Sequence, residues 1–173
     1  MFAPRARSSG GCVWSSDPWD GYGASRVRLL DALERDGIQN VVVLTGDAHA
    51  SWAFDVPRDP FDSTEYDAET GRGSLLVELV TPAVSSPAPG TPEQSIRATH
   101  PHAKFVDQFR QGYLLLDVTP ERALGEWHLV PTVRGRSAAV EVAAHWQTLA
   151  GQPHLAPAAG PSLARSPLPA PAR

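Results

Sequence analysis

The sequence contains a single cysteine, Cys12, among its 173 residues. One thiol cannot form an internal disulfide, and it cannot supply the cysteine clusters that hold structural zinc. Cys12 lies in "SSGGCVWSSDP", a stretch of residues that favour loops, with no base close to it in the sequence. Because a reactive thiolate needs such a neighbour, we expect Cys12 to be a passive free thiol.

Long apolar runs and an excess of basic residues are also lacking. No run of eighteen apolar residues occurs, so we expect no transmembrane helix. The first residues, "MFAPRARSSGGC", are not followed by an apolar segment and do not read as a secretory signal. The formal net charge of -4 shows no excess of basic residues of the kind that binds nucleic acid. These absences leave the cellular location unassigned.

What is present is the composition of a globular protein, with 42% hydrophobic and 20% charged residues. The length fits one domain. Residues 1–18 are expected to form an irregular lead-in, and residues 19–135 the main domain. A short helix is predicted over 136–150. The Pro/Ala-rich segment 151–173 has few large apolar groups, so we predict a disordered tail there.

An α/β unit is predicted near the start of the main domain. In the segment from Gly23 to Gly37, Val27, Leu30 and Leu33 recur at helical spacing, and the arginines are left for the side that faces water. Gly37 is suited to end the helix. The segment 38–44 that follows is apolar and β-branched on both faces, which predicts a strand in the interior of a sheet.

Further strands and loops are expected downstream. Residues 55–73 are polar and contain Pro and Gly, which predicts a long surface loop. A strand is predicted at 74–80, and after another Pro/Ser-rich excursion two more at 112–118 and 124–130. The short link between these two favours an antiparallel hairpin.

The stretch "TGDAH" directly after the first strand carries the clearest chemistry. Open α/β sheets place their sites at the carboxyl ends of strands. In an extended segment Asp47 and His49 point to the same side, so together they could bind a cation such as Zn, Fe or Mn. Gly46 would let the backbone turn sharply. The alternative is structural: Asp47 caps the next segment and His49 makes a local hydrogen bond. Two ligands alone do not make a metal site.

A serine hydrolase is a competing interpretation, because Ser51, His49 and Asp55 are close in sequence. The members of a catalytic triad must meet in space, which closeness in sequence does not favour. The G-x-S-x-G nucleophile elbow is absent. This interpretation predicts that Ser51→Ala abolishes activity and that chelators have no effect.

Several short sequence motifs together resemble those of one family. "WDGY" precedes a helix, a strand then ends in "GDAH", and Ser51 and Trp52 follow. "VELVTPAVSSP" and "HPHAKFVDQFRQGYLLLDVTPERALGEWHLV" continue the likeness in the same order. Over about residues 17 to 133 the chain resembles the C-terminal part of PhoD-type alkaline phosphatases/phosphodiesterases, of the calcineurin-like metallophosphoesterase superfamily.

The resemblance implies a fold, a function and a set of site residues. The fold would be α/β, part of an α-β-β-α sandwich. The function would be metal-dependent hydrolysis of phosphate esters, with calcium and iron as the ions and with export in full-length relatives. Asp47 and His49 would be metal ligands and catalytic residues. Trp19, Tyr22 and His102 would contact substrate, although Trp19 and Tyr22 could equally pack against the helix, and His102 could hold a loop.

The chain departs from the family pattern in two ways. The family usually has Asn where His100 stands. Its upstream ligand motifs, an early acid cluster, a further Asp, and an Asn followed by Asp or His, have no counterpart in residues 1–18. We therefore expect a truncated form whose exposed sheet edges favour an N-terminal half or self-association. A non-catalytic remnant or assembly module of the same fold is the alternative function.

Overall fold

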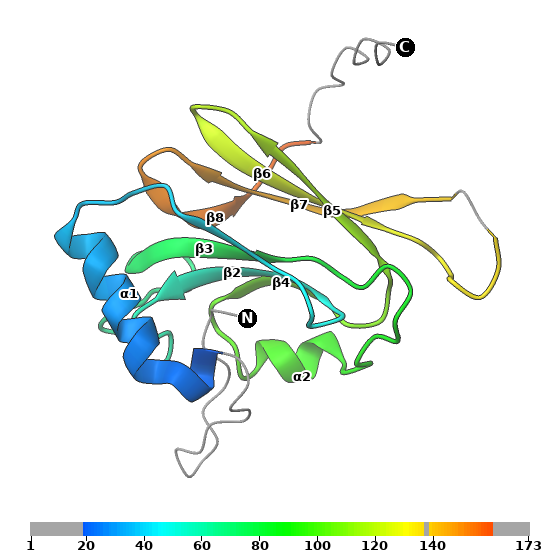
Figure 1. Cartoon of the computed structure of the whole chain (residues 1–173), viewed down its shortest axis with the longest axis horizontal. Helices are drawn as coiled ribbons and strands as arrows, with labels where there is room; N and C mark the ends of the chain where they lie inside the picture. The colour runs from blue at the N-terminus through cyan, green and yellow to red at the C-terminus, as the bar shows by residue number, and fades with distance from the viewer. Residues whose placement is uncertain (1–18, 137–138, 161–173) are drawn as a thin grey trace, which may run out of the picture.

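The structure is a computed structural model that describes residues 19–136 and 139–160. Figure 1 shows three layers: helices on one side, a first sheet in the middle, and a second sheet beyond it. This arrangement confirms an α/β fold that forms part of an α-β-β-α sandwich. The predicted lead-in at 1–18 and the end of the predicted tail, 161–173, lie outside the described residues.

The first sheet has the strand order β1-β3-β2-β4. Its members are β1 (Val42–Thr45), β2 (Ser51–Pro57), β3 (Ser74–Val80) and β4 (Ala103–Asp107). Strand β1 is parallel to β3, whereas β2 is antiparallel to both β3 and β4. The carboxyl ends of β1 and β3 therefore meet at the same edge of the sheet as the start of β2.

Strand β1 forms the outer edge of this sheet among the described residues, so the prediction of an interior strand at 38–44 was wrong. Its neighbour β3, predicted at 74–80, is confirmed and is buried almost throughout. Val43 and Val42 pack on opposite faces of the sheet, whereas Leu44 near the end of the strand is 57% exposed. The uninterrupted apolar sequence did not reveal that, among the described residues, β1 pairs on one side only.

A short 3-10 helix, η1 (Trp19–Tyr22), leads into α1 (Gly23–Arg35). Leu30 is buried against the first sheet and Leu33 packs beside it, as predicted from the spacing. Gly37 follows the helix with φ 64°, a left-handed conformation that suits glycine. Arg26 was expected on the water side but is 7% exposed, because its guanidinium donates to the Pro57 and Arg58 carbonyls.

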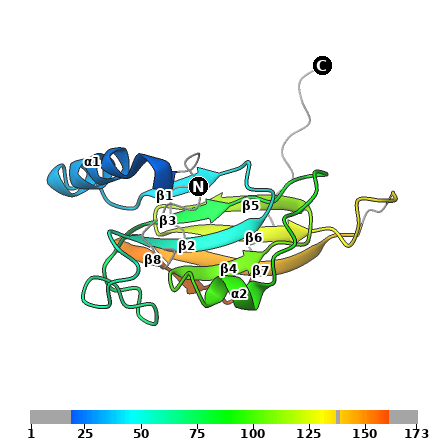
Figure 2. The same ribbon diagram turned by 90° about the horizontal axis from the view of Figure 1, so that it is seen from below.

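The second sheet has the order β5-β6-β7-β8 and is antiparallel throughout. Its members are β5 (Gly112–Val118), β6 (Arg122–Leu129), β7 (Glu141–Leu149) and β8 (Gln152–Pro157). The β5–β6 hairpin is confirmed. Figure 2 shows the two sheets side by side, with the edge strands β1 and β5 toward the same side of the molecule.

Strands β7 and β8 correct two predictions. The segment 136–150 does not form a short helix, because residues 141–149 pair with both β6 and β8. The segment predicted as tail begins with an ordered strand, in which Leu155 is 4% exposed and belongs to the core between the sheets. The β7–β8 hairpin and its pairing with β6 decided both conformations, and helix propensity and composition did not reveal this pairing.

The core has two parts, one on each face of the first sheet. On the helical face, Leu30, Trp52, Phe54 and Ile96 pack together, Ile96 coming from the short helix α2 (Glu93–Arg97). Between the sheets, Trp127 is fully buried and donates from Nε1 to the Val80 carbonyl at 2.9 Å. Within the described part of the chain, no helix is long and apolar enough to cross a membrane.

Candidate metal centre

Asp47 and His49 lie in the turn between β1 and β2. Asp47 has φ 66° and His49 has φ 54°, both in the left-handed region, and the Ala48 amide donates to the Gly46 carbonyl at 2.8 Å. The expectation that an extended backbone points both side chains to one side was wrong, because this segment is a tight turn. Left-handed conformations are unfavourable for residues with a Cβ and are concentrated at functional sites.

The neighbouring loop orients the imidazole ring of His49. His49 Nδ1 lies 3.2 Å from the carbonyl oxygen of Pro87, in the segment that follows β3. A carbonyl oxygen can only accept a hydrogen bond, so Nδ1 carries the proton in this contact. The lone pair is then on Nε2, which is the arrangement common in metal-binding histidines. The Pro87 carbonyl thus leaves Nε2 of His49 available as a candidate nitrogen ligand.

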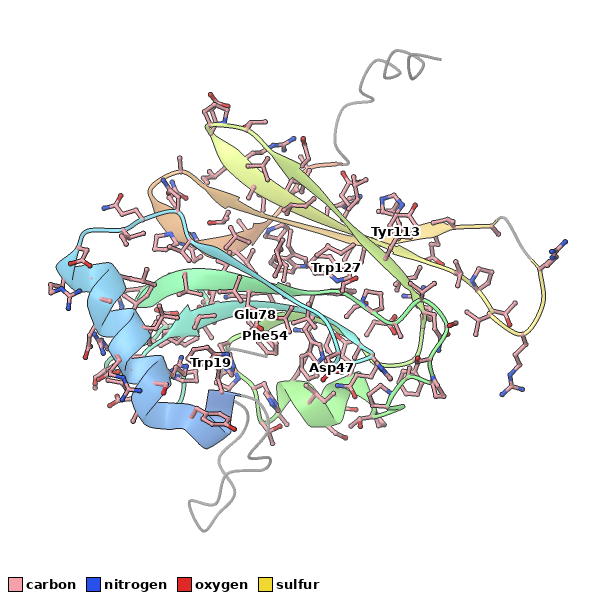
Figure 3. All side chains as sticks on the ribbon, viewed as in Figure 1. Trp19, Asp47, Phe54, Glu78, Tyr113 and Trp127 are labelled. Carbon is pink, nitrogen blue, oxygen red and sulfur yellow. The ribbon has the colours of Figure 1, made fainter. Side chains whose placement is uncertain are left out.

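Asp47, the other predicted ligand, is exposed just after the end of β1. Figure 3 places it at the rim of the first sheet, away from Phe54 and Glu78 in the sheet centre. A carboxylate oxygen and an imidazole nitrogen suit iron or zinc, and the carboxylate also suits calcium. No group of three or more His, Cys, Asp or Glu side chains suited to a metal occurs in residues 19–136 and 139–160. The chemistry of these two side chains therefore fits part of a metal site.

Trp19 and Tyr22 occupy different environments at the start of α1. Trp19 is partly buried and packs against the core on the helical face, which agrees with the packing alternative. Tyr22 is 59% exposed. In Figure 3 Trp19 lies below the sheet beside the start of α1 and well apart from Asp47. A substrate contact remains a prediction for both residues, and Tyr22 has the exposure that such a contact requires.

His102 is fully buried between aromatic side chains. Its ring stacks on Phe54, with centroids 5.1 Å apart, and meets the edge of Phe61 at 6.0 Å. The ring of His100 lies 5.9 Å from it. Packing is the role these contacts describe, and substrate contact by His102 stays a prediction.

The structure does not support a serine nucleophile. Ser51 is completely buried at the start of β2, and its hydroxyl has no hydrogen-bond partner among the described residues. His49, the base in that interpretation, faces the Pro87 carbonyl instead. Asp55 is engaged with Tyr66 and Leu155. Without a hydrogen bond between nucleophile and base, the three residues do not form a triad.

One residue near this edge was missed by the sequence analysis. Glu78 lies in the middle of β3 and is completely buried, and its Oε1 accepts a hydrogen bond of 2.5 Å from the Thr45 hydroxyl. The sequence contains a signal for this residue, because a single acid interrupts the apolar run "SLLVELV". A buried carboxylate inside a strand calls for an explanation.

Comparisons with known proteins agree with one another. The family model described as PhoD-like phosphatase matches residues 2–127. Alkaline phosphatase D of Bacillus subtilis (strain 168) is 32% identical over 136 residues, which cover 76% of this chain and 22% of that protein. A solved structure titled "Structure of PhoD" is 28% identical, with a TM-score of 0.78 over 94% of this chain and 31% of the other. The chain thus spans less than a third of the length of these relatives.

Proposed function

Because the chain belongs to the PhoD-like phosphatase family, we propose that it contributes two metal ligands, Asp47 and His49, to a hydrolase of phosphate esters. Their place at the carboxyl end of β1, beside the end of β3, is where open α/β sheets build sites. The observation that carries the proposal is the orientation of His49 by Pro87, which leaves Nε2 ready to bind an ion.

The chemistry of the donor set supports calcium and iron as the ions. Bound ions supply a water that is deprotonated near neutral pH and charge that stabilises the phosphoryl oxygens in the transition state. Asp47 offers an oxygen ligand, which calcium and iron both accept, and His49 offers a nitrogen ligand for iron. The phosphate ester is the substrate in this account, and Tyr22 with Trp19 and His102 are the candidates to contact it.

We propose that an N-terminal half or a second copy of the chain supplies the remaining ligands, because residues 19–136 and 139–160 hold no group of three or more metal-binding side chains. The open side of the sandwich supports such a partner. A groove of about 290 Å³ lies between β1 and the second sheet, with Val42 of β1 and Leu116 and Val118 of β5 in its lining. Val118 is 58% exposed. Apolar strands with open edges are unusual in isolated proteins and favour pairing.

The test is hydrolysis of p-nitrophenyl phosphate and bis(p-nitrophenyl) phosphate by the purified chain, over a range of protein concentrations. We expect metal-dependent release of nitrophenol that EDTA and Asp47→Asn abolish and that Ser51→Ala preserves. Because self-association would complete the site, specific activity should rise with protein concentration.

Two results would contradict the proposal. Loss of activity in Ser51→Ala combined with insensitivity to EDTA would indicate the serine mechanism. No metal-dependent hydrolysis at any concentration would favour the non-catalytic remnant or assembly module, which is supported by the absence of a group of three or more metal-binding side chains within the described part of the chain.

A further inference from the structure

Glu78 is a carboxylate placed in an apolar environment. It is completely buried in the central part of β3, and Leu76 and Val80, two positions away on either side, belong to the core on the helical face. Phe54 is its cross-strand partner on β2. Figure 3 shows Glu78 and Phe54 close together in the middle of the first sheet. An apolar side chain would satisfy this position as packing, so the acid needs another reason.

The carboxylate holds the last residue of β1. The Thr45 hydroxyl donates to Glu78 Oε1 at 2.5 Å, and the Thr45 carbonyl accepts from the Thr81 amide at 2.9 Å. Side chain and backbone of Thr45 are therefore both fixed to β3. The next two residues along the chain are Gly46 and Asp47, where the left-handed turn begins.

The turn needs to be held at both ends. Asp47 and His49 adopt backbone conformations that residues with a Cβ leave when they are free to do so. Such conformations persist only where the surroundings determine them. On the far side, Ala50 and Ser51 are buried at the start of β2, and His49 is bound to Pro87. On the near side the fixed point is Thr45.

We propose that Glu78 is a positioning residue that acts through Thr45 to hold the turn 46–50 in the conformation that presents Asp47 and His49. It touches neither ion nor substrate. This inference rests on the proposed function, because the hydrogen bond between Thr45 and Glu78 would maintain the geometry with which Asp47 and His49 bind metal. Whether that hydrogen bond fixes the turn does not depend on metal binding.

The experiment combines two measurements on the full chain. Amide hydrogen exchange of residues 46–50 reports the turn, and a Co²⁺ titration followed by visible absorption reports metal binding. Thr45→Val and Glu78→Leu remove the hydrogen bond, whereas Thr45→Ser and Glu78→Gln keep a donor or an acceptor. Thr148→Val is the matched control, because the Thr148 hydroxyl makes an equivalent bond of 2.7 Å to the Gln152 carbonyl in the other sheet.

We expect faster exchange at 46–50 and Co²⁺ affinity lowered about tenfold in Thr45→Val and Glu78→Leu, the size typical of losing a group that orients a ligand. Thr45→Ser and Glu78→Gln should restore both, and Thr148→Val should change neither. If Glu78→Leu fails to fold, Thr45→Val still decides the result.

The outcomes separate this inference from the proposed function. Unchanged exchange at 46–50 in Thr45→Val would overturn the inference, whatever Co²⁺ does. Faster exchange together with no Co²⁺ binding by the unmodified chain would support the positioning role and count against the metal site.

Discussion

The backbone amide of Leu155 on β8 donates a hydrogen bond of 2.7 Å to the carboxylate of Asp55 on β2. Strand β8 belongs to the second sheet and β2 to the first, so this contact joins the two sheets. The same carboxylate accepts from the Tyr66 hydroxyl at 2.9 Å and lies 3.2 Å from Lys104 Nζ. Asp55 thus connects β2, β8, the long loop after β2, and β4.

Removing the Asp55 carboxylate should destabilise the fold strongly. Asp55→Ala would leave the amide of Leu155 and the largely buried Lys104 without this partner. Loss of one member of a buried ion pair typically costs about 3–5 kcal/mol. Chemical denaturation should show a loss of that order, while Asp36→Ala, which breaks an exposed pair with Arg35, should leave the midpoint unchanged. A small effect of Asp55→Ala would mean that the network contributes little.

The same residue predicts a dependence of stability on pH. Burial raises the pKa of Asp55, and the attraction of Lys104 and the hydrogen bonds from Leu155 and Tyr66 only partly oppose this. The folded state therefore holds the proton more tightly than the unfolded state. The resulting stabilisation is complete below the ordinary carboxyl pKa of about 3.9 and is lost as pH rises through the higher folded value.

The measurement is the free energy of unfolding of the unmodified chain and of Asp55→Asn between pH 3 and 8. We expect the advantage of the unmodified chain over the variant to shrink as pH rises. An advantage that grows with pH would show that the charged form is the one the fold prefers, with Lys104 dominating over burial.

Gly73 should be intolerant of substitution. It has φ 88°, and a Cβ there would lie 1.8 Å from the backbone oxygen of Glu65. Gly73→Ala should therefore destabilise by more than about 4 kcal/mol or prevent folding. Gly151 is the matched control: it has φ 78° but an open space around it, so Gly151→Ala should cost only the roughly 1–2 kcal/mol of the left-handed conformation. Equal effects would contradict the clash.

Tyr22 and Trp19 should respond differently to truncation. Because Tyr22 is exposed and Trp19 packs on the core, Tyr22→Ala should leave the melting temperature unchanged and Trp19→Ala should lower it. If Tyr22 contacts the phosphate ester, KM should rise in Tyr22→Ala with little change of kcat. An unchanged KM would remove Tyr22 from the substrate site.

The sequence predicted the elements that depend on local pattern. The helix that buries Leu30 and ends before Gly37, the strand at 74–80 and the β5–β6 hairpin all have periodicity or turn signals. Strand β2 has no such signal. It is buried at every position, so apolar and polar residues do not alternate, and Asp55 and Pro57 are typical of loops. Its acid is compatible with burial because Leu155, a hundred residues away, supplies a donor together with Tyr66 and Lys104.

For the candidate site, the sequence predicted residues but not their conformation. Asp47 and His49 stay predictions, and the left-handed turn that carries them was taken for extended backbone. Neither the Pro87 carbonyl that orients His49 nor the Glu78 carboxylate that binds Thr45 can be inferred from spacing, since both contacts cross between segments more than 30 residues apart. Long-range contacts of this kind require the fold to be known.

The central claim is that Asp47 and His49 bind metal, and elemental analysis of the purified chain tests it most directly. The Asp47→Ala/His49→Ala variant should lose the ion, while Asp36→Ala/His145→Ala, which removes the same side-chain types elsewhere, should keep it. We expect near-stoichiometric iron, zinc or calcium in the unmodified chain and in this control only. Equal metal content in all three proteins, at background or above it, would show that Asp47 and His49 do not bind metal.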